Sequence, residues 1–309
     1  MDTKSRLDPA DPAAEVTSFG AVKFPRPFSS LVNVEMYALS DQGHIRANNE
    51  DHYLVVRGGR AMETVLSNLA ENQPGYLFEE TLYAMVIADG LGGEAGGEVA
   101  SSEAIYTLMD LVLRTPDWQV RWTAKEENTV MWRLTDRFRK INAELLEQAA
   151  ANPALAGMST TMTAAVTFGN SVIVGHIGDS RAYLLHNGKL QRLTRDHTLA
   201  QRLIDEGIQG PNDQLVRGLR NVLMQALGSR EGKCDPDVQL YPLADGDQLL
   251  LCTDGLTDMV DDGLIESVLS REGSAQSACQ DLVNLALSNG GRDNVTVIVA
   301  RYSFPKPND

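Results

Sequence analysis

The sequence has few cysteines and no long apolar run. Its 309 residues include three cysteines, odd in number and far apart: Cys234, Cys252 and Cys279. This spacing excludes a disulfide framework and a CxxC metal knuckle, and it favours a reducing, cytoplasmic location. No segment approaches the roughly 20 consecutive apolar residues of a membrane helix. The polar, acidic start MDTKSRLDPADPAAEV has no basic-then-apolar secretion signal.

Positive charge is also scarce. The chain has 27 lysines and arginines against 42 aspartates and glutamates, for a formal net charge of -15. A surface with this balance repels phosphate backbones and anionic lipids, so neither nucleic acid nor a membrane is an expected partner. Most of these acids should lie on solvated faces. A clustered subset could instead bind cations.

Several catalytic signatures are missing. The glycine-rich segment 88–101 lacks the G-K-[ST] end of a P-loop. No cysteine begins the C-x₅-R loop of cysteine phosphatases, and Ser180, in GDSRA, lacks the G-x-S-x-G spacing of a nucleophile elbow. These absences disfavour a P-loop nucleotide site, a phosphocysteine intermediate and a serine nucleophile.

Short apolar segments predict strands, several with a period of two, as in TMTAAVTF. The expected strands are 33–40, 51–57, 81–88, 161–168, 171–177, 181–186, 189–193, 237–241, 247–253 and 294–303. The dipeptides Gly169-Asn170 and Asn187-Gly188 each separate two of these strands, and such dipeptides favour tight hairpins. Consecutive hairpins predict an antiparallel sheet rather than parallel βαβ crossovers.

Apolar stripes predict three long helices, at 97–113, 126–150 and 274–289. Long amphipathic helices among runs of strands indicate an α+β fold in which helices cover sheets. One domain should span 33–303, between a poorly ordered tail at 1–32, rich in Pro, Ala and Asp, and a short tail at 304–309. A docking peptide is the alternative interpretation of residues 1–32.

The segment AMVIADGLGGEAGGEVAS, residues 84–101, ends an apolar run in Asp89 and then places five glycines within eight residues. Gly90, Gly92 and Ala95 fit the dinucleotide fingerprint G-x-G-x-x-G/A. Asp89 would, however, place a negative charge beside the pyrophosphate, and the downstream hairpins contradict the parallel crossovers which that fold needs. Two interpretations stay equal from this segment alone: Asp89 holds a hard cation, or it caps the following helix.

Acids recur where other predicted strands meet loops. They are Glu50, Asp51, Asp179, Asp254, Asp258 and Asp293. One such acid is more often a helix cap or a turn residue. Several at one sheet edge would repel each other unless cations neutralised them. Ligand sets made only of oxygen select Mg²⁺ or Mn²⁺ over zinc, and the lack of clustered His and Cys agrees.

These segments, in this order, resemble the metal-dependent protein phosphatases of the protein phosphatase 2C class, in their bacterial form. The matching segments are RANNED 46–51, ADGLGGEAGGEVAS 88–101, STT 159–161, GDSRAYLL 178–185, LTRDHT 193–198, NVLMQALGS 221–229, LLLCTDGLTDMV 249–260 and GGRDNVTVIV 290–299. They span nearly all of 33–303. The resemblance implies a four-layer α-β-β-α sandwich, with two antiparallel sheets packed face to face and flanked by helices.

The resemblance also implies a site for two Mn²⁺ or Mg²⁺ ions at one end of the sandwich. By position, Asp89 would bridge both ions and the Gly90 carbonyl would bind one. The other implied groups are Asp254 and Asp293 for the second ion, Glu50 and Asp51 directly or through water, Asp179 with Asp254 and Asp258 for a weaker third ion, and Arg46 for the substrate phosphate.

The implied reaction is hydrolysis of phosphoserine and phosphothreonine in proteins. Two cations about 3.5–4 Å apart would lower the pKa of a bridging water, and the resulting hydroxide would attack phosphorus in line without a covalent phosphoenzyme. Arg46 would give bidentate bonds to phosphate oxygens. The general acid is unassigned, because Leu91 and Glu94 stand where some family members carry histidine.

The remaining polar candidates have more ordinary interpretations. His176 should be a hydrogen-bonded core residue, and His197 should order the loop before the next helix. His44 and His52 lie near the expected site and are the two histidines with a possible direct role. The residues expected in structural roles are Arg181 and Arg195, in ion pairs, and Cys252, as a small buried residue.

Two segments should set specificity. Residues 207–220 correspond to a mobile flap in bacterial relatives. Residues 57–80 form a long excursion, an ordered lid or a surface loop, in which we expect a short helix around Glu63–Leu69 without a catalytic part. The expected partners are phosphorylated proteins, namely a serine/threonine kinase or its targets, bound by a monomer. One alternative is a regulator of another phosphoprotein system, such as sigma-factor signalling. The other is a non-catalytic binding module. Such a module should have lost Arg46 or one of the acids expected to bind metal, and none of them is lost.

Overall fold

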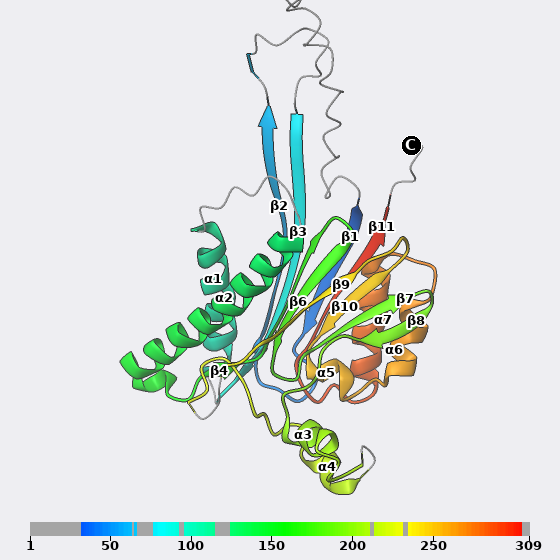
Figure 1. The fold of residues 1–309 in the computed structure, drawn as a ribbon. Coiled ribbons are helices and arrows are strands. Elements are labelled where there is room, and N and C mark those ends of the chain that lie inside the picture. The colour runs from blue at the N-terminus through cyan, green and yellow to red at the C-terminus, as the bar shows by residue number, and fades with distance from the viewer. Residues whose placement is uncertain are drawn as a thin grey trace, which may run out of the picture.

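The computed structural model describes residues 32–63, 65–66, 77–92, 96–114, 124–210, 213–230 and 234–304. Two sheets pack face to face, with helices on both outer sides (Figure 1). The expected four-layer α-β-β-α sandwich is therefore confirmed. The expected tails, 1–32 and 304–309, lie outside the described residues except for Val32, which is buried between the sheets, and Phe304.

The first sheet has the strand order β1-β11-β10-β7-β8, and each neighbouring pair is antiparallel. Its strands are β1 (Asn33–Asp41), β7 (Arg181–His186), β8 (Lys189–Arg192), β10 (Gln248–Cys252) and β11 (Val295–Ser303). β10 and β11 are antiparallel neighbours, so the end of β10 lies beside the start of β11. This arrangement brings the acids that follow β10 and precede β11 to one end of the sheet.

The second sheet has the order β2-β3-β5-β6-β9, also antiparallel, and β4 pairs with the end of β3. Its strands are β2 (Asp51–Glu63), β3 (Leu77–Leu91), β4 (Ser159–Thr160), β5 (Met162–Phe168), β6 (Ser171–Ile177) and β9 (Asp237–Pro242). The predicted hairpin turns are confirmed: Gly169, Asn187 and Gly188 have φ angles of 54°, 50° and 72°, which a tight turn between strands requires.

Two helices, α1 (Gly96–Leu113) and α2 (Ala124–Ala151), cover the second sheet, while α6 (Asp262–Leu269) and α7 (Ala275–Ser288) cover the first. α1, α2 and α7 match the three predicted helices within two residues. The shorter elements are η3 (Pro153–Leu155), α3 (Leu199–Asp205), α4 (Gln214–Gly218) and α5 (Asp254–Thr257). α3 and α4 project from the body beside one end of the sandwich, and α4 falls within the expected flap (Figure 1). Among the described residues, no helix is both long and apolar enough to cross a bilayer.

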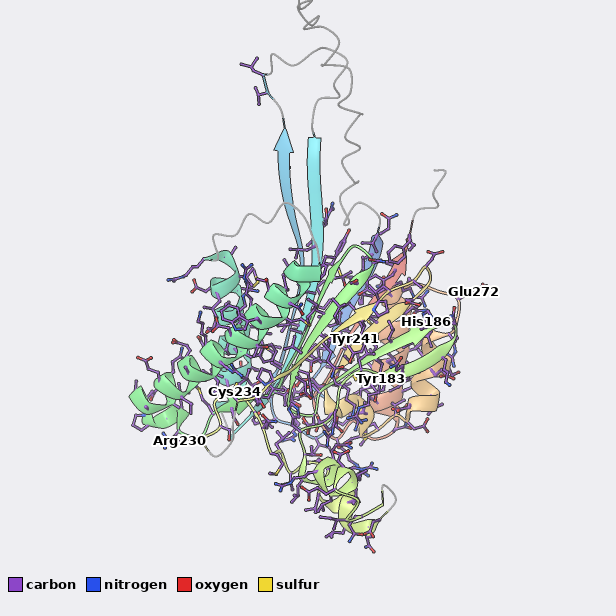
Figure 2. All side chains as sticks on the ribbon, viewed as in Figure 1. Tyr183, His186, Arg230, Cys234, Tyr241 and Glu272 are labelled. Atoms are coloured by element: carbon purple, nitrogen blue, oxygen red, sulfur yellow. The ribbon has the colours of Figure 1, made fainter. Side chains whose placement is uncertain are left out.

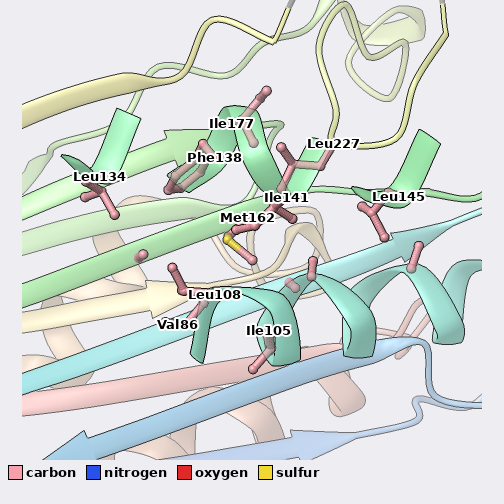
Figure 3. Close-up of a cluster of buried hydrophobic side chains, with 14 of the residues drawn as sticks. Val86, Ile105, Leu108, Leu134, Phe138, Ile141, Leu145, Met162, Ile177 and Leu227 are labelled. Carbon is pink, nitrogen blue, oxygen red and sulfur yellow. The ribbon is translucent and has the colours of Figure 1, made fainter. Parts of the chain in front are cut away.

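Both faces of the central strands are buried, which explains why β3 has a continuous apolar run. Met85 and Ile87 point into the core between the sheets, and Val86 and Ala88 point into the core under α1 and α2. Figure 3 shows this second core, where Phe138, Ile141 and Leu145 of α2 pack over the sheet. A third cluster lies between the first sheet and α6–α7. These three layers of core hold the strand ends in fixed positions.

The excursion at 57–80 begins and ends as strand. β2 continues to Glu63 and β3 starts at Leu77, and the paired register runs without a break from Asp51↔Asp89 to Glu63↔Leu77. The result is a two-stranded extension that projects beyond the sandwich (Figure 1). The expected helix around Glu63–Leu69 is wrong at its first residue, which is in β2; residues 65–66 have no regular secondary structure, and 64 and 67–69 lie outside the described residues. Backbone pairing with 77–80 overrides the weak local helical pattern here.

Candidate metal centre

Asp51 and Asp89 meet at one end of the second sheet, where they are direct partners in the β2–β3 ladder. The residues next to them in sequence, Glu50 and Gly90, are joined as well, because the Gly90 amide donates to the Glu50 carbonyl at 3.2 Å. The position of Asp89 is fixed on its other side by Thr160, whose hydroxyl donates to the Asp89 carbonyl at 2.7 Å. Two carboxylates of the same sign therefore project from adjacent, rigid strands.

The first sheet contributes its acids at the same end. Asp254 begins α5 two residues after β10, and Asp293 lies two residues before β11. The hydroxyls of Thr253 and Thr296 both donate to Asp51 Oδ2, at 2.9 and 2.7 Å, so the two sheets are joined across the site. The sequence analysis did not single out these threonines, whose bonds span 202 and 245 positions of chain.

Burial and mutual repulsion raise the pKa values of the clustered aspartates. Desolvation raises the pKa of Asp51 to about 7, with contributions from Asp254 and Asp293 and opposition from the two threonine hydrogen bonds. Desolvation likewise raises the pKa of Asp254 to about 7, followed by repulsion from Asp258 and Asp293. The pKa of Asp89 is raised well above its ordinary value by burial and then by the charges of Asp51, Asp254, Asp179 and Asp293. Asp51, Asp179, Asp254 and Asp293, from four other segments, all lie close enough to Asp89 for their charges to act on it.

The donor set suits a hard divalent cation. Among the described residues, Asp51 Oδ1 and Asp254 Oδ1 are buried oxygens without a hydrogen-bond partner. A buried carboxylate oxygen without a partner carries a large desolvation cost, which a bound cation would remove. The oxygens available here are carboxylates and backbone carbonyls, the ligands that Mg²⁺ and Mn²⁺ prefer.

The described carboxylates do not by themselves form a complete set of metal ligands. Within the described ranges, no group of three or more His, Cys, Asp or Glu side chains is arranged to hold a metal ion. Asp293 Oδ2 instead forms an ion pair with Arg46 Nη2. The hydrogen bond with Asp293 raises the pKa of Arg46. In this conformation the expected phosphate-binding arginine and an expected metal ligand thus neutralise each other.

Asp179 and Asp258 add two acids to the cluster beside Asp254. Asp179 is buried, and desolvation followed by the charge of Asp254 raises its pKa well above the ordinary value. Asp258 is exposed, and its Oδ2 lies 3.5 Å from Asn221 Nδ2 in the segment that follows α4. Asp258 therefore links the acidic cluster to the segment after α4.

The glycines of the loop after Asp89 serve close packing. A Cβ on Gly90 would lie 2.2 Å from the Gly97 carbonyl oxygen, and one on Gly97 would lie 2.4 Å from Glu50 Oε2. Side chains at either position would push α1 away from β3 and displace Glu50. Residues 93–95 lie outside the described residues, so this observation concerns the two ends of the loop.

Four of the histidines fall into two pairs: His176 and His197 make structural hydrogen bonds, and His44 and His52 are the two expected near the site. His176 is buried, its Nδ1 lies 2.9 Å from Thr163 Oγ1, and desolvation lowers its pKa to about 3. His197 accepts a hydrogen bond from the Gly178 amide at 3.2 Å, which orders the loop ahead of Asp179. Close to the acids, His52 Nδ1 lies 2.9 Å from Ser101 Oγ. The His44 ring is exposed.

Arg181 and Arg195 form ion pairs, as expected. Arg181 binds Asp196, which also accepts from Arg192, and its Nη1 donates to the Tyr183 hydroxyl at 3.2 Å. Tyr183 lies on β7 of the first sheet (Figure 2). Arg195 pairs with Asp205. Cys252 is buried, and desolvation raises the pKa of its thiol to about 12, so it is unreactive.

Comparison with known proteins places this site in a family. Residues 77–290 match the family described as Protein phosphatase 2C. The chain is 35% identical over 265 residues to the serine/threonine phosphatase stp of Listeria welshimeri, covering 86% of this chain and 94% of that protein. It is 37% identical over 263 residues to the serine/threonine protein phosphatase PstP of Mycobacterium tuberculosis, covering 85% of this chain and 44% of that protein.

Solved structures agree. The M. tuberculosis phosphatase PstP/Ppp superposes with a TM-score of 0.69 at 35% identity, covering 88% of this chain and 99% of that chain. The PstP catalytic domain in complex with two manganese ions gives a TM-score of 0.67 at 33% identity, over 88% of this chain and 99% of that chain. The chain belongs to the protein phosphatase 2C family.

Proposed function

We propose that this protein is a metal-dependent serine/threonine protein phosphatase. The observation that carries the proposal is the convergence of Asp51, Asp89, Asp179, Asp254 and Asp293, from five separate segments, at one end of the sandwich, with two of their buried oxygens lacking a partner among the described residues. Such a cluster is stable when cations neutralise it. Support also comes from relatives named as serine/threonine phosphatases, one of them in complex with two manganese ions.

The assignments that we propose follow chain position and geometry. Asp89, with the Gly90 carbonyl, Asp254 and Asp293, would hold two Mn²⁺ or Mg²⁺ ions. The further groups are Glu50 and Asp51, directly or through water, and Asp179, Asp254 and Asp258 for a possible third ion. When bound, the ions would supply an activated water and positive charge against the phosphate dianion.

The protein's own groups would position the substrate and the acids. Thr253 and Thr296 fix the Asp51 carboxylate through Oδ2 and leave Oδ1 facing the cluster. Arg46, half exposed at the rim, has a guanidinium that can bind two phosphate oxygens at once. For this it must leave Asp293, and the same movement frees the Asp293 carboxylate. The opening of this one ion pair would therefore serve both substrate and metal binding.

The partners and the setting are part of the proposal. The substrates would be proteins phosphorylated by a serine/threonine kinase, or the kinase itself, in the cytoplasm, and the enzyme would act as a monomer. The decisive experiment is hydrolysis of a phosphothreonine peptide by purified protein with Mn²⁺, stopped by EDTA. Absence of Mn²⁺-dependent activity on phosphopeptides and on p-nitrophenyl phosphate would contradict it.

A further inference from the structure

Asn294 is a buried residue whose three side-chain hydrogen bonds go to one segment of the chain. It is 6% exposed and directly follows Asp293. Its Oδ1 accepts from the Glu50 amide at 2.8 Å, and its Nδ2 donates to the carbonyls of Gln42 and Asn48, each at 2.9 Å. These three bonds all go to the backbone of 42–50, which joins β1 to β2 and is named here the β1–β2 arm.

The β1–β2 arm carries Arg46 and Glu50 but has no helix or strand of its own. Its shape therefore depends on the segment that it packs against. The His44 amide donates to the Gly291 carbonyl at 2.7 Å, and a Cβ on Gly43 would lie 2.3 Å from the Asp293 carbonyl oxygen. The arm rests on residues 291–294, and the Asn294 amide holds it at three points along its length.

Arg46 is consequently held at both ends by two consecutive residues. Asp293 binds its guanidinium, and Asn294 binds the backbone on either side of it, at Gln42 and Asn48. When the guanidinium leaves Asp293 to bind phosphate, the Asn294 bonds remain, and together with the bond from Gln42 Nε2 to the Arg46 carbonyl at 2.7 Å they keep the base of the arginine in place. A loop fixed in advance binds its ligand without the entropic cost of ordering.

We propose that Asn294 is a positioning residue for phosphate binding, acting through Arg46. The inference rests on the proposed function, since it assigns Arg46 to the phosphate. Asparagine is suited to this place because it offers one acceptor and two donors from a short side chain. Aspartate would keep the acceptor, lose both donors and add a charge to the acidic cluster, and alanine would leave two carbonyls and an amide without their partner.

The test compares Asn294→Ala and Asn294→Asp with Asn142→Ala. Asn142 is a matched control, because its Oδ1 accepts from the Gly228 amide at 2.9 Å in a part-buried position on α2, outside the β1–β2 arm. Inorganic phosphate is titrated calorimetrically into each Mn²⁺-loaded protein, with melting temperature recorded. We expect about tenfold weaker phosphate binding for both Asn294 variants, the scale of one strong hydrogen bond, and unchanged binding for Asn142→Ala.

A double-mutant cycle separates positioning from general loss of stability. In an Arg46→Ala background, Asn294→Ala should weaken phosphate binding no further, because the group through which it acts is gone. A full additional tenfold loss, or unchanged phosphate affinity in folded Asn294 variants, would overturn the inference. Wild-type protein that binds phosphate through Arg46 and Asn294 without hydrolysing any phosphoester would contradict the proposed function alone. Wild-type protein that neither binds phosphate nor hydrolyses a phosphoester would overturn both the inference and the proposed function.

Discussion

Asp51 and Asp89 stand directly opposite each other in the β2–β3 ladder, with Asp254 and Asp293 arriving from the other sheet. Cross-strand partners have Cβ atoms roughly 4.5–5.5 Å apart, and like charges there destabilise a sheet. Nothing in the local strand geometry requires either acid, since apolar residues occupy the neighbouring positions of β3. The pair therefore destabilises the metal-free fold, and we explain its presence by metal binding.

Replacing Asp89 by Asn should remove turnover and strengthen the metal-free protein. Loss of one ligand should lower Mn²⁺-dependent activity by at least about 10²-fold, the scale of one electrostatic stabiliser. Loss of one crowded charge should raise the metal-free melting temperature by about 2–4 °C, which corresponds to ~1 kcal/mol in a domain of this size. Asp254→Asn should behave alike. Activity assays and thermal melts in EDTA check both effects.

The control for this prediction is Asp110→Asn, because Asp110 is exposed on α1 and its side chain pairs with Arg114. It should alter neither activity nor the metal-free melting temperature measurably. Wild-type rates in both Asp89→Asn and Asp254→Asn would show that the ligands are misassigned.

Asp179→Ala should reduce activity less completely than Asp89→Asn. The charge of Asp254 acts on Asp179, but in our assignment Asp179 touches only a third ion. The variant should keep measurable turnover and need more Mn²⁺ for half-maximal rate. A Mn²⁺ titration of p-nitrophenyl phosphate hydrolysis measures this, and complete inactivation equal to that of Asp89→Asn would argue for a core role.

The metal-free protein should lose stability as pH rises from about 4 to above 7. The folded pKa values of Asp51 and Asp254, about 7, lie above their ordinary value of 3.8, so the folded state keeps protons that the unfolded chain releases. Their contribution is complete below the unfolded pKa and disappears as pH rises through the folded one, at up to about 1.4 kcal/mol per pH unit for each proton. Urea unfolding in EDTA at pH 5 to 8 measures the slope.

Mn²⁺ should reverse this trend, because the ion binds deprotonated carboxylates and its affinity increases with pH. The same unfolding series with Mn²⁺ is the control. If chelated protein were equally stable across the range, or more stable at pH 8 than at pH 5, the crowding of these acids would be disproved.

Arg46→Ala should raise KM for a phosphopeptide about tenfold or more without weakening Mn²⁺ binding. The arginine pairs with Asp293, so its removal takes away a phosphate contact and also a competitor for a metal ligand. Arg46→Lys keeps the positive charge but not the planar guanidinium, so its KM should lie between those of the wild type and Arg46→Ala. Steady-state kinetics and Mn²⁺ calorimetry check the two effects separately; weakened Mn²⁺ binding with unchanged KM would exclude this role.

Shortening the β2–β3 extension should leave catalysis intact. Arg57 pairs with Tyr83, so replacing 58–82 by Asn-Gly closes the hairpin with a two-residue turn. The metal acids lie at the opposite ends of the same strands, and hydrolysis of p-nitrophenyl phosphate should stay within about twofold of wild type, since no group assigned to the reaction is removed. A folded variant with lost activity would give the extension a part in the reaction.

Local patterns were enough to predict most of the elements. Hairpin dipeptides such as Asn187-Gly188, the continuous apolar run of β3 and the stripes of α1, α2 and α7 act over a few residues, which a sequence displays directly. The short helices α3, α4 and α6 were not predicted, although each begins with a capping side chain, on Thr198, Asp213 and Asp261. The strand extension past Arg57 was missed because RGGRAME has no strand periodicity and its Gly-Gly dipeptide is typical of a turn or loop.

The sequence by itself determined which acids follow or precede strands, and the ordered set of segments that includes them was enough to indicate the family. Only the tertiary structure decided what each one contacts: Asp51 bound by Thr253 and Thr296, Asp293 bound to Arg46, and Asn294 bound to the β1–β2 arm. These contacts join positions more than 200 residues apart. Side-chain hydrogen bonds over such separations depend on how two sheets pack, and no local periodicity encodes that.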